Sequence, residues 1–255
     1  MKETENSRNR SAIARSYLGK TVTVIIDRPL GSAHAQYPNT VYPINYGYIP
    51  GTTGGDGEEI DVYLLGVDHP VKEYIATVIG IVFRENDGED KLVAAPAGVF
   101  YHQGEIAEAV HFQERYFKTH IDAIYQKSCG AIIFRKNGSI VEYLCLQQKK
   151  SGIFSVPKGH MEAFETEEET ALREIKEEAG ITVAFLPGFK KEIRYKLPFH
   201  KHKLLILFLA EYNGNLSVNR QEISRYSWLP YKKAKHTLPK GYSEAMEQAK
   251  KVLEQ

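Results

Sequence analysis

The stretch that decides the fold is "GHMEAFETEEETALREIKEEAG", from Gly159 to Gly180, which holds eight glutamates in 22 residues. Thr166, followed three positions later by Glu169, has the pattern of a capping box, which starts a helix. Gly180 is suited to the left-handed conformation that ends one. The segment therefore predicts a helix between Thr166 and Gly180 that carries an unusual concentration of negative charge.

The expected helix has two different faces. At about 100° per residue, Leu172, Ile175 and Ala179 fall on one face and are expected to point into the core. Three glutamates form a second stripe on the flank of that face: Glu174, Glu177 and Glu178. A solvated acidic helix usually alternates acidic and basic residues four positions apart, and this stripe does not. Three carboxylates within one turn instead indicate a site for a hard divalent cation such as Mg²⁺, which prefers oxygen ligands and pairs with phosphate groups.

The spacing of the same segment matches a long sequence signature. Gly159, five residues, Glu165, seven residues and then "REIKEEAGI" agree with the Nudix box at every defined position. Residues 128 to about 238 are therefore identified as similar to the Nudix hydrolases. The resemblance implies an α/β/α sandwich and hydrolysis of a nucleoside diphosphate that is linked to another moiety.

The resemblance also implies roles for single residues of the box. It assigns metal binding to Glu174 and Glu178, with Glu177 assisting. It makes the carbonyl of Gly159 a further metal ligand and gives Arg173 the task of orienting a box glutamate. The metal is expected to be Mg²⁺, with Mn²⁺ as an alternative.

The same chemistry requires a general base. A metal ion neutralises phosphate oxygens and lowers the pKa of the attacking water, and a side chain must then take the proton of that water. The candidates are a box glutamate, Glu177 or Glu178, and Glu222, which lies in a loop six residues before Trp228. An ordinary loop acid is the alternative interpretation of Glu222.

The flanks of the box narrow the substrate class. Four segments resemble the asymmetric diadenosine tetraphosphate hydrolases: "CGAIIF" (129–134), "SVPKGHMEAFET" (155–166), "GFKKEIRY" (188–195) and "SRYSWLP" (224–230). This implies that Lys158 and His160 contact the polyphosphate and that Tyr195 lies beside the nucleotide, where its ring can stack on a base. Lys201 and Lys203 fall where the family keeps phosphate-binding lysines, and plain surface charge is their alternative. The alternative substrates are other nucleoside polyphosphates, including oxidised triphosphates and capped RNA ends.

A second oxygen-rich cluster lies in "VYPINYGYIPGTTGGDGEEIDVYLLG", residues 41–66. Its acidic side chains are Asp56, Glu58, Glu59 and Asp61. A solvated turn would explain them, because Gly-Asp-Gly is itself a turn signal. Together with "GEDKLVAAP" (88–96), however, the stretch resembles the soluble inorganic pyrophosphatases over residues 20 to about 118. The resemblance implies a small β-barrel of oligonucleotide-binding-like topology with a helix against it, metal binding by Asp56, Asp61 and Asp90, and substrate contacts from Tyr42, Tyr46 and Lys91.

This second resemblance is incomplete. The middle acid of the loop is Glu58 rather than aspartate, and "EDKL" is one residue short of the family spacing. The segment between Asp27 and Tyr42 is too short for the hairpin in which that family keeps a lysine, a glutamate and an arginine. Asp27 and Lys118 are candidate substitutes for a first-strand glutamate and a late lysine. These departures argue against full pyrophosphatase activity, whereas the retained acids still favour a metal site.

The chain is expected to contain two domains. A flexible lead-in over residues 1–17 precedes a pyrophosphatase-like domain, 18–122, and a Nudix domain, 128–255. A helix is predicted within "EIAEAVHFQERYFKTH" (105–120), and a hairpin turn at Asn137-Gly138.

Composition limits the partners. The chain is 42% hydrophobic and 25% charged, which is typical of a folded protein, and its net charge of +1 gives no strong signal for nucleic acid or a membrane. The polar N-terminus lacks the apolar core of a secretory signal, so we expect a cytoplasmic protein. The leading hypothesis is an enzyme with a nucleotide polyphosphate substrate. A nucleotide sensor without turnover is the alternative, with the first domain as a dimerisation module in a homo-oligomer.

Overall fold

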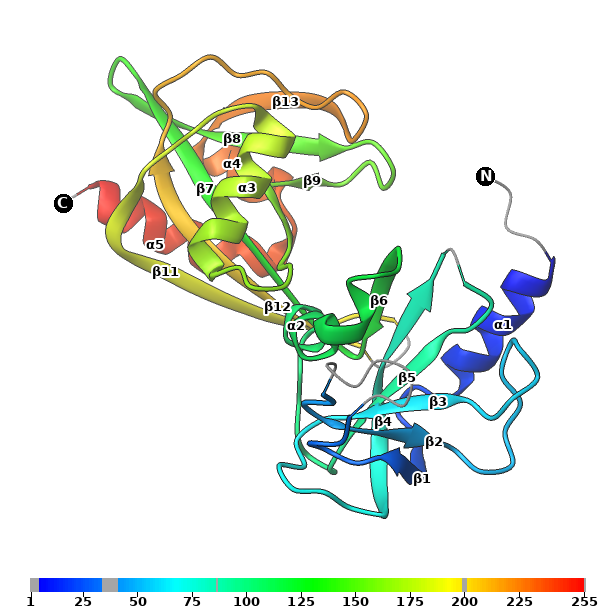
Figure 1. The fold of residues 1–255 in the computed structure, drawn as a ribbon. Helices are drawn as coiled ribbons and strands as arrows, with labels where there is room; N and C mark the ends of the chain where they lie inside the picture. Colours follow the sequence, from blue (N-terminus) through cyan, green and yellow to red (C-terminus); the bar gives the residue numbers. More distant parts are fainter. Residues whose placement is uncertain (1–4, 34–40, 86, 199–200, 255) are drawn as a thin grey trace. The chain divides into compact units, whose positions relative to one another are not determined.

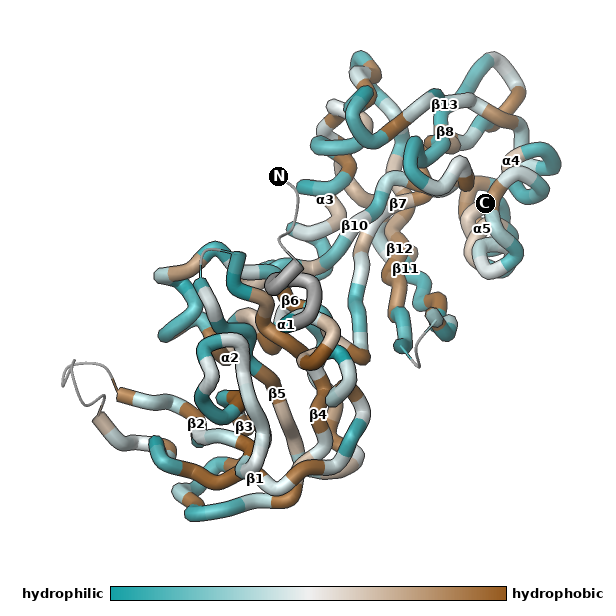
Figure 2. Tube along the Cα trace, turned by 90° about the vertical axis from the view of Figure 1, so that its right-hand side faces the viewer, coloured by the Kyte–Doolittle hydropathy of each residue, from teal (hydrophilic) through white to brown (hydrophobic). Residues whose placement is uncertain are grey.

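The computed structural model describes residues 5–33, 41–85, 87–198 and 201–254. The chain forms two compact units, Met1–Tyr125 and Gln126–Gln255, and each has its own hydrophobic core (Figure 1). Hydrophobic residues follow the central strands of both units, whereas hydrophilic residues occupy loops and outer helix surfaces (Figure 2). None of the helices in the described ranges is both long and apolar enough to cross a membrane.

The N-terminal unit is a closed barrel of five strands. Its elements are α1 (Glu5–Ser16), β1 (Thr21–Arg28), β2 (Asn45–Tyr48), β3 (Asp61–Leu64), β4 (Glu73–Arg84), β5 (Lys91–Ala95), α2 (Gln103–Glu114) and β6 (Thr119–Ala123). The order β1-β2-β3-β5-β4 closes because β4 also pairs with β1, and β6 adds to β4 outside the ring. Closure leaves the ring without a free edge. The predicted barrel with a helix against it is confirmed.

Two segments of the N-terminal unit differ from the predictions. Glu5–Ser16 is a helix and not a flexible lead-in, because Ala14 is buried in the barrel core and Arg10 pairs with Asp90. The helix predicted within 105–120 starts earlier, at Gln103, and ends at Glu114. The residues that follow form β6 because they pair with β4, and this tertiary pairing overrides the local helical pattern.

The C-terminal unit is a sheet with helices on both faces. Its elements are β7 (Tyr125–Asn137), β8 (Ile140–Gln148), β9 (Phe154–Ser155), β10 (Lys158–His160), α3 (Glu167–Ala179), β11 (Phe185–Lys196), β12 (His202–Glu211), β13 (Ile223–Pro230), α4 (Tyr231–Thr237), the 3₁₀ turn η1 (Lys240–Tyr242) and α5 (Ser243–Leu253). The strand order is β11-β12-β7-β8-β13, with β10 on β7 and β9 on β8. The predicted hairpin joins β7 to β8, but its turn is one residue later than expected: Asn137 pairs with Ile140, and the turn residues are Gly138, with a positive φ of 61°, and Ser139.

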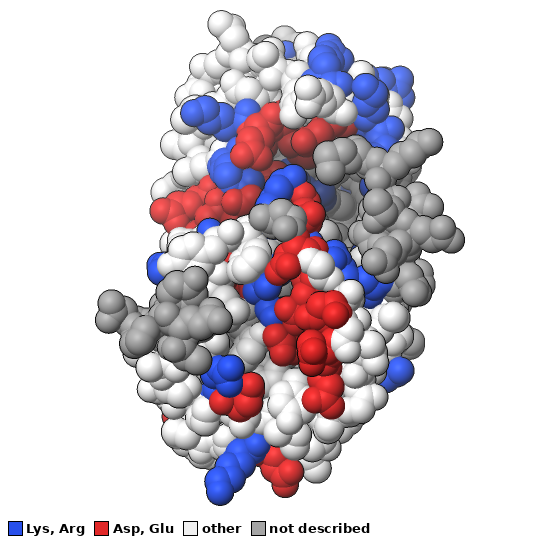
Figure 3. Space-filling view, turned by 45° about the vertical axis from the view of Figure 1, so that its right-hand side comes forward, with Lys and Arg blue, Asp and Glu red and all other residues white. Residues whose placement is uncertain are grey.

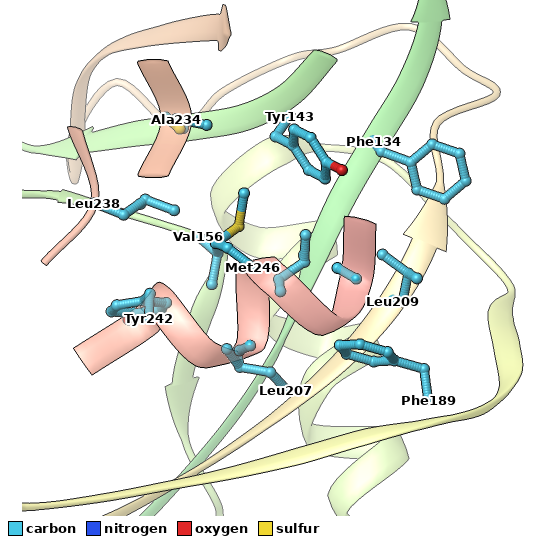
Figure 4. Close-up of a cluster of buried hydrophobic side chains, with 14 of the residues drawn as sticks. Phe134, Tyr143, Val156, Phe189, Leu207, Leu209, Ala234, Leu238, Tyr242 and Met246 are labelled. Atoms are coloured by element: carbon cyan, nitrogen blue, oxygen red, sulfur yellow. The ribbon is translucent and has the colours of Figure 1, made fainter. Parts of the chain in front are cut away.

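Both faces of this sheet are buried, which makes the sandwich three-layered. Alternate residues of a strand point to opposite faces. Ile132 and Phe134 pack with Tyr143, Leu207 and Met246 under α4 and α5 (Figure 4). The intervening residues, such as Ala131 and Ile133, pack under α3. The predicted α/β/α sandwich is confirmed, and α3, which carries the glutamates, packs on the face opposite α4 and α5.

Candidate active site

Helix α3 begins and ends as the sequence predicts. The Thr166 side chain accepts a hydrogen bond from the Glu169 N–H at 3.2 Å, and the Glu169 carboxylate accepts one from the Thr166 N–H at 2.8 Å. Gly180 takes the left-handed conformation with φ 69°. A Cβ on Gly180 would lie 2.5 Å from the carbonyl oxygen of Ser217, so glycine also allows the following loop to approach the helix end.

The buried face of α3 differs from the prediction by one position. Ala171, Ile175 and Ala179 are fully buried against the sheet. Leu172 was expected on this face, but it is 37% exposed, so this part of the prediction was wrong. Residues four apart share a face, whereas Leu172 lies about 100° round the helix from Ala171 and therefore leaves the sheet.

The three flank glutamates differ in burial and in hydrogen-bond partners. Glu178 is buried, and its two carboxylate oxygens accept hydrogen bonds from Gln148 Nε2 at 3.0 Å and from the Lys158 N–H at 3.1 Å. The side chain of Glu177 is 54% exposed, which puts it at the rim. Glu177 nevertheless shares a donor with Glu174, because Arg173 Nη1 donates to both, at 3.3 and 2.8 Å. A metal-binding role for Glu177 stays a prediction.

The carboxylate of Glu174 lies directly against the backbone of Gly159. A Cβ on Gly159 would lie 2.0 Å from the carboxyl carbon of Glu174, closer than any real contact. Gly159 is held in place by β10, where it pairs with Cys129 of β7. Glycine at this position is therefore what allows a carboxylate and a main-chain segment to share the same small space.

Arg173 fixes the acidic residues from one side. Its Nε and Nη2 donate to the two oxygens of Glu165 at 2.6 and 3.0 Å. Its Nη1 donates to Glu174 at 2.8 Å and to Glu177 at 3.3 Å, and Nη2 also donates to the carbonyl of His160 at 2.8 Å. The bond from Arg173 lowers the pKa of Glu165 to about 2. The bidentate ion pair with Glu165 sets the orientation of the Arg173 guanidinium, and this group in turn positions Glu174.

The two inner carboxylates are in an environment that disfavours their charge. Burial raises the pKa of Glu174 to about 7, and the charges of Glu178 and Glu177 add to the rise. Burial also raises the pKa of Glu178, although Gln148 and Lys158 oppose this effect. Two desolvated carboxylates on successive turns form a site that a cation would stabilise.

The donor set fits a cation that keeps water or phosphate ligands. Among the residues that the structure describes, no three His, Cys, Asp or Glu side chains are placed to enclose a metal. Glu174 and Glu178 offer two carboxylates, with the main chain of Gly159 against the first of them. Mg²⁺ is usually held by one or two carboxylates and completes its shell with water and substrate phosphate. The arrangement therefore suits an open site.

A basic side of the site is built by β10, β11 and β12. The Nζ of Lys203, a buried residue, lies 2.8 Å from His160 Nε2. Burial, with the charges of Lys203 and Lys158, lowers the pKa of His160 to about 4, so its ring is neutral and accepts the hydrogen bond. Burial lowers the pKa of Lys203 to about 7, and repulsion from Lys158 adds to the effect. Tyr195 is the cross-strand partner of Lys203 and is 39% exposed.

The structure therefore groups four of the predicted substrate residues, which are Lys158, His160, Tyr195 and Lys203. Lys201 lies in the turn before β12, where its carbonyl accepts a hydrogen bond from the Leu197 N–H at 2.8 Å.

The loop before β13 brings Glu222 to the same end of α3. The Asn219 N–H donates to the carbonyl of Glu178 at 3.0 Å, and the Glu222 N–H donates to that of Asn219 at 3.2 Å. The charge of Glu222 contributes to the raised pKa of Glu178. Gln148, which holds Glu178, was missed by the sequence analysis, because a single glutamine at the end of a strand belongs to no motif.

In the N-terminal unit, three predicted residues meet at one end of the barrel. Lys91 Nζ lies 2.7 Å from Tyr46 Oη and 2.5 Å from Asp61 Oδ2, and the Tyr46 hydroxyl donates to Asp61. Glu89 joins them at 2.8 Å from Lys91 Nζ. The predicted site residue was Asp90 and not Glu89. Strand alternation could have found Glu89, because residues two apart share a face.

Other predicted residues of this unit lie elsewhere. Asp90 faces the opposite side of β5 and pairs with Arg10 at 2.9 Å. Asp56 lies in an exposed turn, where its carboxylate accepts a backbone hydrogen bond at 3.1 Å. Lys118 is exposed and forms an ion pair with Glu85. The structure therefore does not bring Asp56, Asp61 and Asp90 into one site.

Tyr42 and Asp27 lie near the Asp61 cluster. The ring of Tyr42 packs against that of Tyr46 with 5.6 Å between centroids. Asp27, near the end of β1, forms an ion pair with Arg28 at 2.8 Å. Burial raises the pKa of Asp27, and the charge of Asp61 adds to the rise.

Comparison with known families gives one match for each unit. Residues 124–249 match the NUDIX domain, and residues 14–125 match the inorganic pyrophosphatase family. Hydrolases of both families generally use divalent metal ions.

Curated relatives support the C-terminal match more fully than the N-terminal one. Bis(5'-nucleosyl)-tetraphosphatase (asymmetrical) of Sus scrofa is 38% identical over 40% of this chain and 78% of its own length. The Mus musculus protein of the same name is 36% identical over 46% of this chain and 92% of its own length. The inorganic pyrophosphatase of Saccharolobus solfataricus is 42% identical, but over 24% of this chain and only 37% of its own length. Through its C-terminal unit, the chain belongs to the Nudix hydrolases, and it carries this enzyme domain behind a region that matches the inorganic pyrophosphatases.

Proposed function

We propose that residues 128–255 hydrolyse nucleoside polyphosphates, and that dinucleoside tetraphosphates are the preferred class. One observation carries this proposal: the buried Glu178 and the Gly159-backed Glu174 adjoin the basic group of Lys158, His160 and Lys203. A cation site beside the lysines Lys158 and Lys203 suits a substrate with several adjacent phosphates. The relatives named for asymmetric tetraphosphatase activity support the finer assignment.

Glu174, Glu178 and the carbonyl of Gly159 would hold Mg²⁺ or Mn²⁺, with Glu177 at the rim. A bound ion of this kind supplies charge neutralisation for phosphate oxygens and acidifies an attacking water. Arg173 acts by holding Glu174 at 2.8 Å while Glu165 fixes the guanidinium.

We assign the general base to Glu222. The bond from the Asn219 N–H to the Glu178 carbonyl holds the loop of Glu222 at the end of α3, and the charge of Glu222 adds to the raised pKa of Glu178. Both oxygens of Glu178 already accept hydrogen bonds, from Gln148 and from Lys158, which leaves that residue less suited to proton transfer. Glu177, exposed at the rim, is the other candidate.

The basic side of the site binds the polyphosphate. Lys158 and Lys203 supply positive charge, and a phosphate beside Lys203 would favour its protonated form. Neutral His160 accepts a hydrogen bond from Lys203 and so fixes the direction of the ammonium. Tyr195, on the same sheet face as Lys203, offers a ring for base stacking.

Product analysis with a panel of dinucleoside polyphosphates, nucleoside triphosphates and capped RNA tests the substrate. Cleavage of diadenosine tetraphosphate to ATP and AMP, faster than that of the other compounds, is the expected result. Preferred turnover of triphosphates or capped RNA would refute the finer assignment.

The Glu178→Gln variant tests catalysis itself. Loss of a metal ligand removes several kcal/mol of transition-state stabilisation, so we expect a rate about 10²–10³-fold lower. Glu168→Gln, on the exposed side of the same helix, is the matched control and should keep full activity. If the wild-type protein showed no turnover and Glu178→Gln changed only the affinity for nucleotide, the protein would be a nucleotide sensor and not an enzyme.

A further inference from the structure

The pyrophosphatase-like unit neutralises its acidic residues with cations of its own chain. Lys91 Nζ sits between two carboxylates, 2.5 Å from Asp61 and 2.8 Å from Glu89. The Lys91 side chain is only 3% exposed, and the Tyr46 hydroxyl adds a second donor to Asp61. The ammonium therefore occupies the point at which a metal bridging the two carboxylates would have to sit.

Arg84 neutralises further acidic residues of this unit. Its Nε and Nη2 donate to both oxygens of Glu114 at 3.0 and 2.6 Å, and its Nη1 donates to Asp87 at 2.8 Å. Glu114 also accepts a hydrogen bond from the Tyr63 hydroxyl. The guanidinium carbon lies 3.7 Å from the ring centroid of Phe117. Each face of this buried cation thus has a partner.

Arg10 of α1 is the third cation of this unit that pairs with its acidic residues. Its Nε donates to Asp90 at 2.9 Å, its Nη1 to the carbonyl of Asp87 at 2.7 Å and its Nη2 to the carbonyl of Arg84 at 3.2 Å. The Asp90 side chain is 1% exposed. A Cβ on Gly55 would lie 2.5 Å from Arg10 Cδ, so the side chain passes close beside the glycine loop that precedes Asp56.

A divalent cation does not fit residues arranged in this way. In the N-terminal unit the carboxylates of Asp61, Glu89 and Asp90 each already contact a lysine or arginine side chain. Binding a metal at Asp61 or Asp90 would displace a buried ammonium or guanidinium, and an unpaired buried charge is strongly unfavourable. Figure 3 shows the mixed pattern, in which acidic side chains gather over the N-terminal unit in the lower part of the view with basic ones among them.

We propose that the N-terminal unit is a metal-independent, non-catalytic companion of the Nudix domain, in which Lys91, Arg84 and Arg10 take the place of metal ions. Helix α1 completes this arrangement, because Arg10 reaches the acidic loops only when α1 is docked. The family likeness is thus retained in the fold while the ions are replaced by side chains.

Counting bound ions in the full chain tests the proposal. The wild-type chain and the variant Asp61→Asn are titrated with Mn²⁺ and the number of bound ions is measured. The expected result is the same number for both, because any ions belong to the Nudix domain. One ion fewer in the variant would overturn the proposal. Should Asp61→Asn fail to fold, Glu89→Gln, which removes the charge of the other carboxylate on Lys91, is titrated with the same two outcomes.

Helix α1 offers a matched pair of variants for the second measurement. Arg10→Gln removes the buried pair with Asp90, whereas Arg15→Gln removes a longer pair with Asp122, at 3.8 Å, and a cation–π contact with Phe83. Thermal unfolding of the N-terminal unit is followed in EDTA and in Mg²⁺. We expect Arg10→Gln to lower its Tm by more than Arg15→Gln, and the wild-type transition to be the same in both buffers. Equal Tm values for the two variants would refute the proposal. It would also be refuted if Mg²⁺ raised the Tm of the wild-type N-terminal unit and the Asp61→Asn variant no longer showed this rise.

Discussion

Gly159→Ala should separate the chemistry of the Nudix site from the stability of its fold. The added Cβ would lie 2.0 Å from the Glu174 carboxyl carbon, whereas ordinary contact begins at 3.4 Å, so this carboxylate must move by about 1.4 Å. The obstructed group is the end of a flexible side chain, and such a group can move without unfolding the helix. Its movement breaks the 2.8 Å bond from Arg173 and shifts a proposed metal ligand.

A misplacement of about 1 Å in an active site can cost about 10²-fold in rate. We therefore expect kcat for diadenosine tetraphosphate to fall about 10²-fold and Mn²⁺ affinity to fall with it. The Tm should drop by no more than a few degrees, since the destabilisation is of the order of 1 kcal/mol. Steady-state kinetics, calorimetric Mn²⁺ titration and thermal melts give the three quantities.

The matched control is Gly214→Ala, where the new Cβ would meet nothing within 4 Å. It should retain wild-type rate, affinity and Tm. If Gly159→Ala kept both Mn²⁺ affinity and kcat near wild type, Glu174 would not be confined by Gly159 as the geometry requires. If Gly159→Ala unfolded while Gly214→Ala did not, the contact between Gly159 and Glu174 would serve the stability of the fold, and its proposed role in metal binding would be refuted.

Three further predictions concern the same domain. Gln148→Leu removes the 3.0 Å bond to Glu178, so Mn²⁺ affinity should fall about 10–100-fold, and an unchanged Kd would show that Gln148 does not position the carboxylate. The pKa of Lys203 is lowered to about 7, so KM for the polyphosphate should rise as pH rises above 7. Lys203→Arg should abolish this rise, because arginine stays charged. The same dependence of KM on pH in the wild type and the variant would contradict the role of Lys203 in binding the polyphosphate. The pKa of Glu165 in the folded protein is about 2, below its ordinary 4.5, so its contribution to stability is full above about pH 4.5 and is lost as pH falls toward 2. Glu165→Gln should therefore lower the free energy of unfolding by about 2 kcal/mol at pH 7 and by less at pH 3, and equal losses at both pH values would refute this account.

Local sequence signals predicted the elements whose causes are local. The capping box at Thr166, the helix end at Gly180 and the hairpin after Asn137 depend on a few consecutive residues. The first two are confirmed, and the hairpin forms with its turn one residue later than predicted, at Gly138-Ser139. Leu172 was misplaced because the helix period alone does not say which side of a stripe meets the sheet. The N-terminal helix was missed because its order depends on Arg10 reaching residues more than 70 positions away.

Strand pairing decided what the motifs could not. The acid-rich segment before β5 offers Glu89 and Asp90 in adjacent positions, and a motif one residue short cannot choose between them. In the structure Glu89 contacts Lys91, whereas Asp90 pairs with Arg10 of the distant helix α1. Likewise, only the sheet brings Gln148 to Glu178, thirty residues along the chain.

The sequence by itself determined which side chains are available for chemistry, because the Nudix box and its spacing place their functional groups on one helix. It also determined the two-domain plan, since each half carries the hydrophobic pattern of its own core. Only the tertiary structure decided which of those groups meet and which are already paired. Glu174 is held by Arg173, its neighbour on the same helix, whereas Asp61 and Asp90 pair with Lys91 and Arg10 from distant segments, and sequence spacing alone does not reveal such pairs.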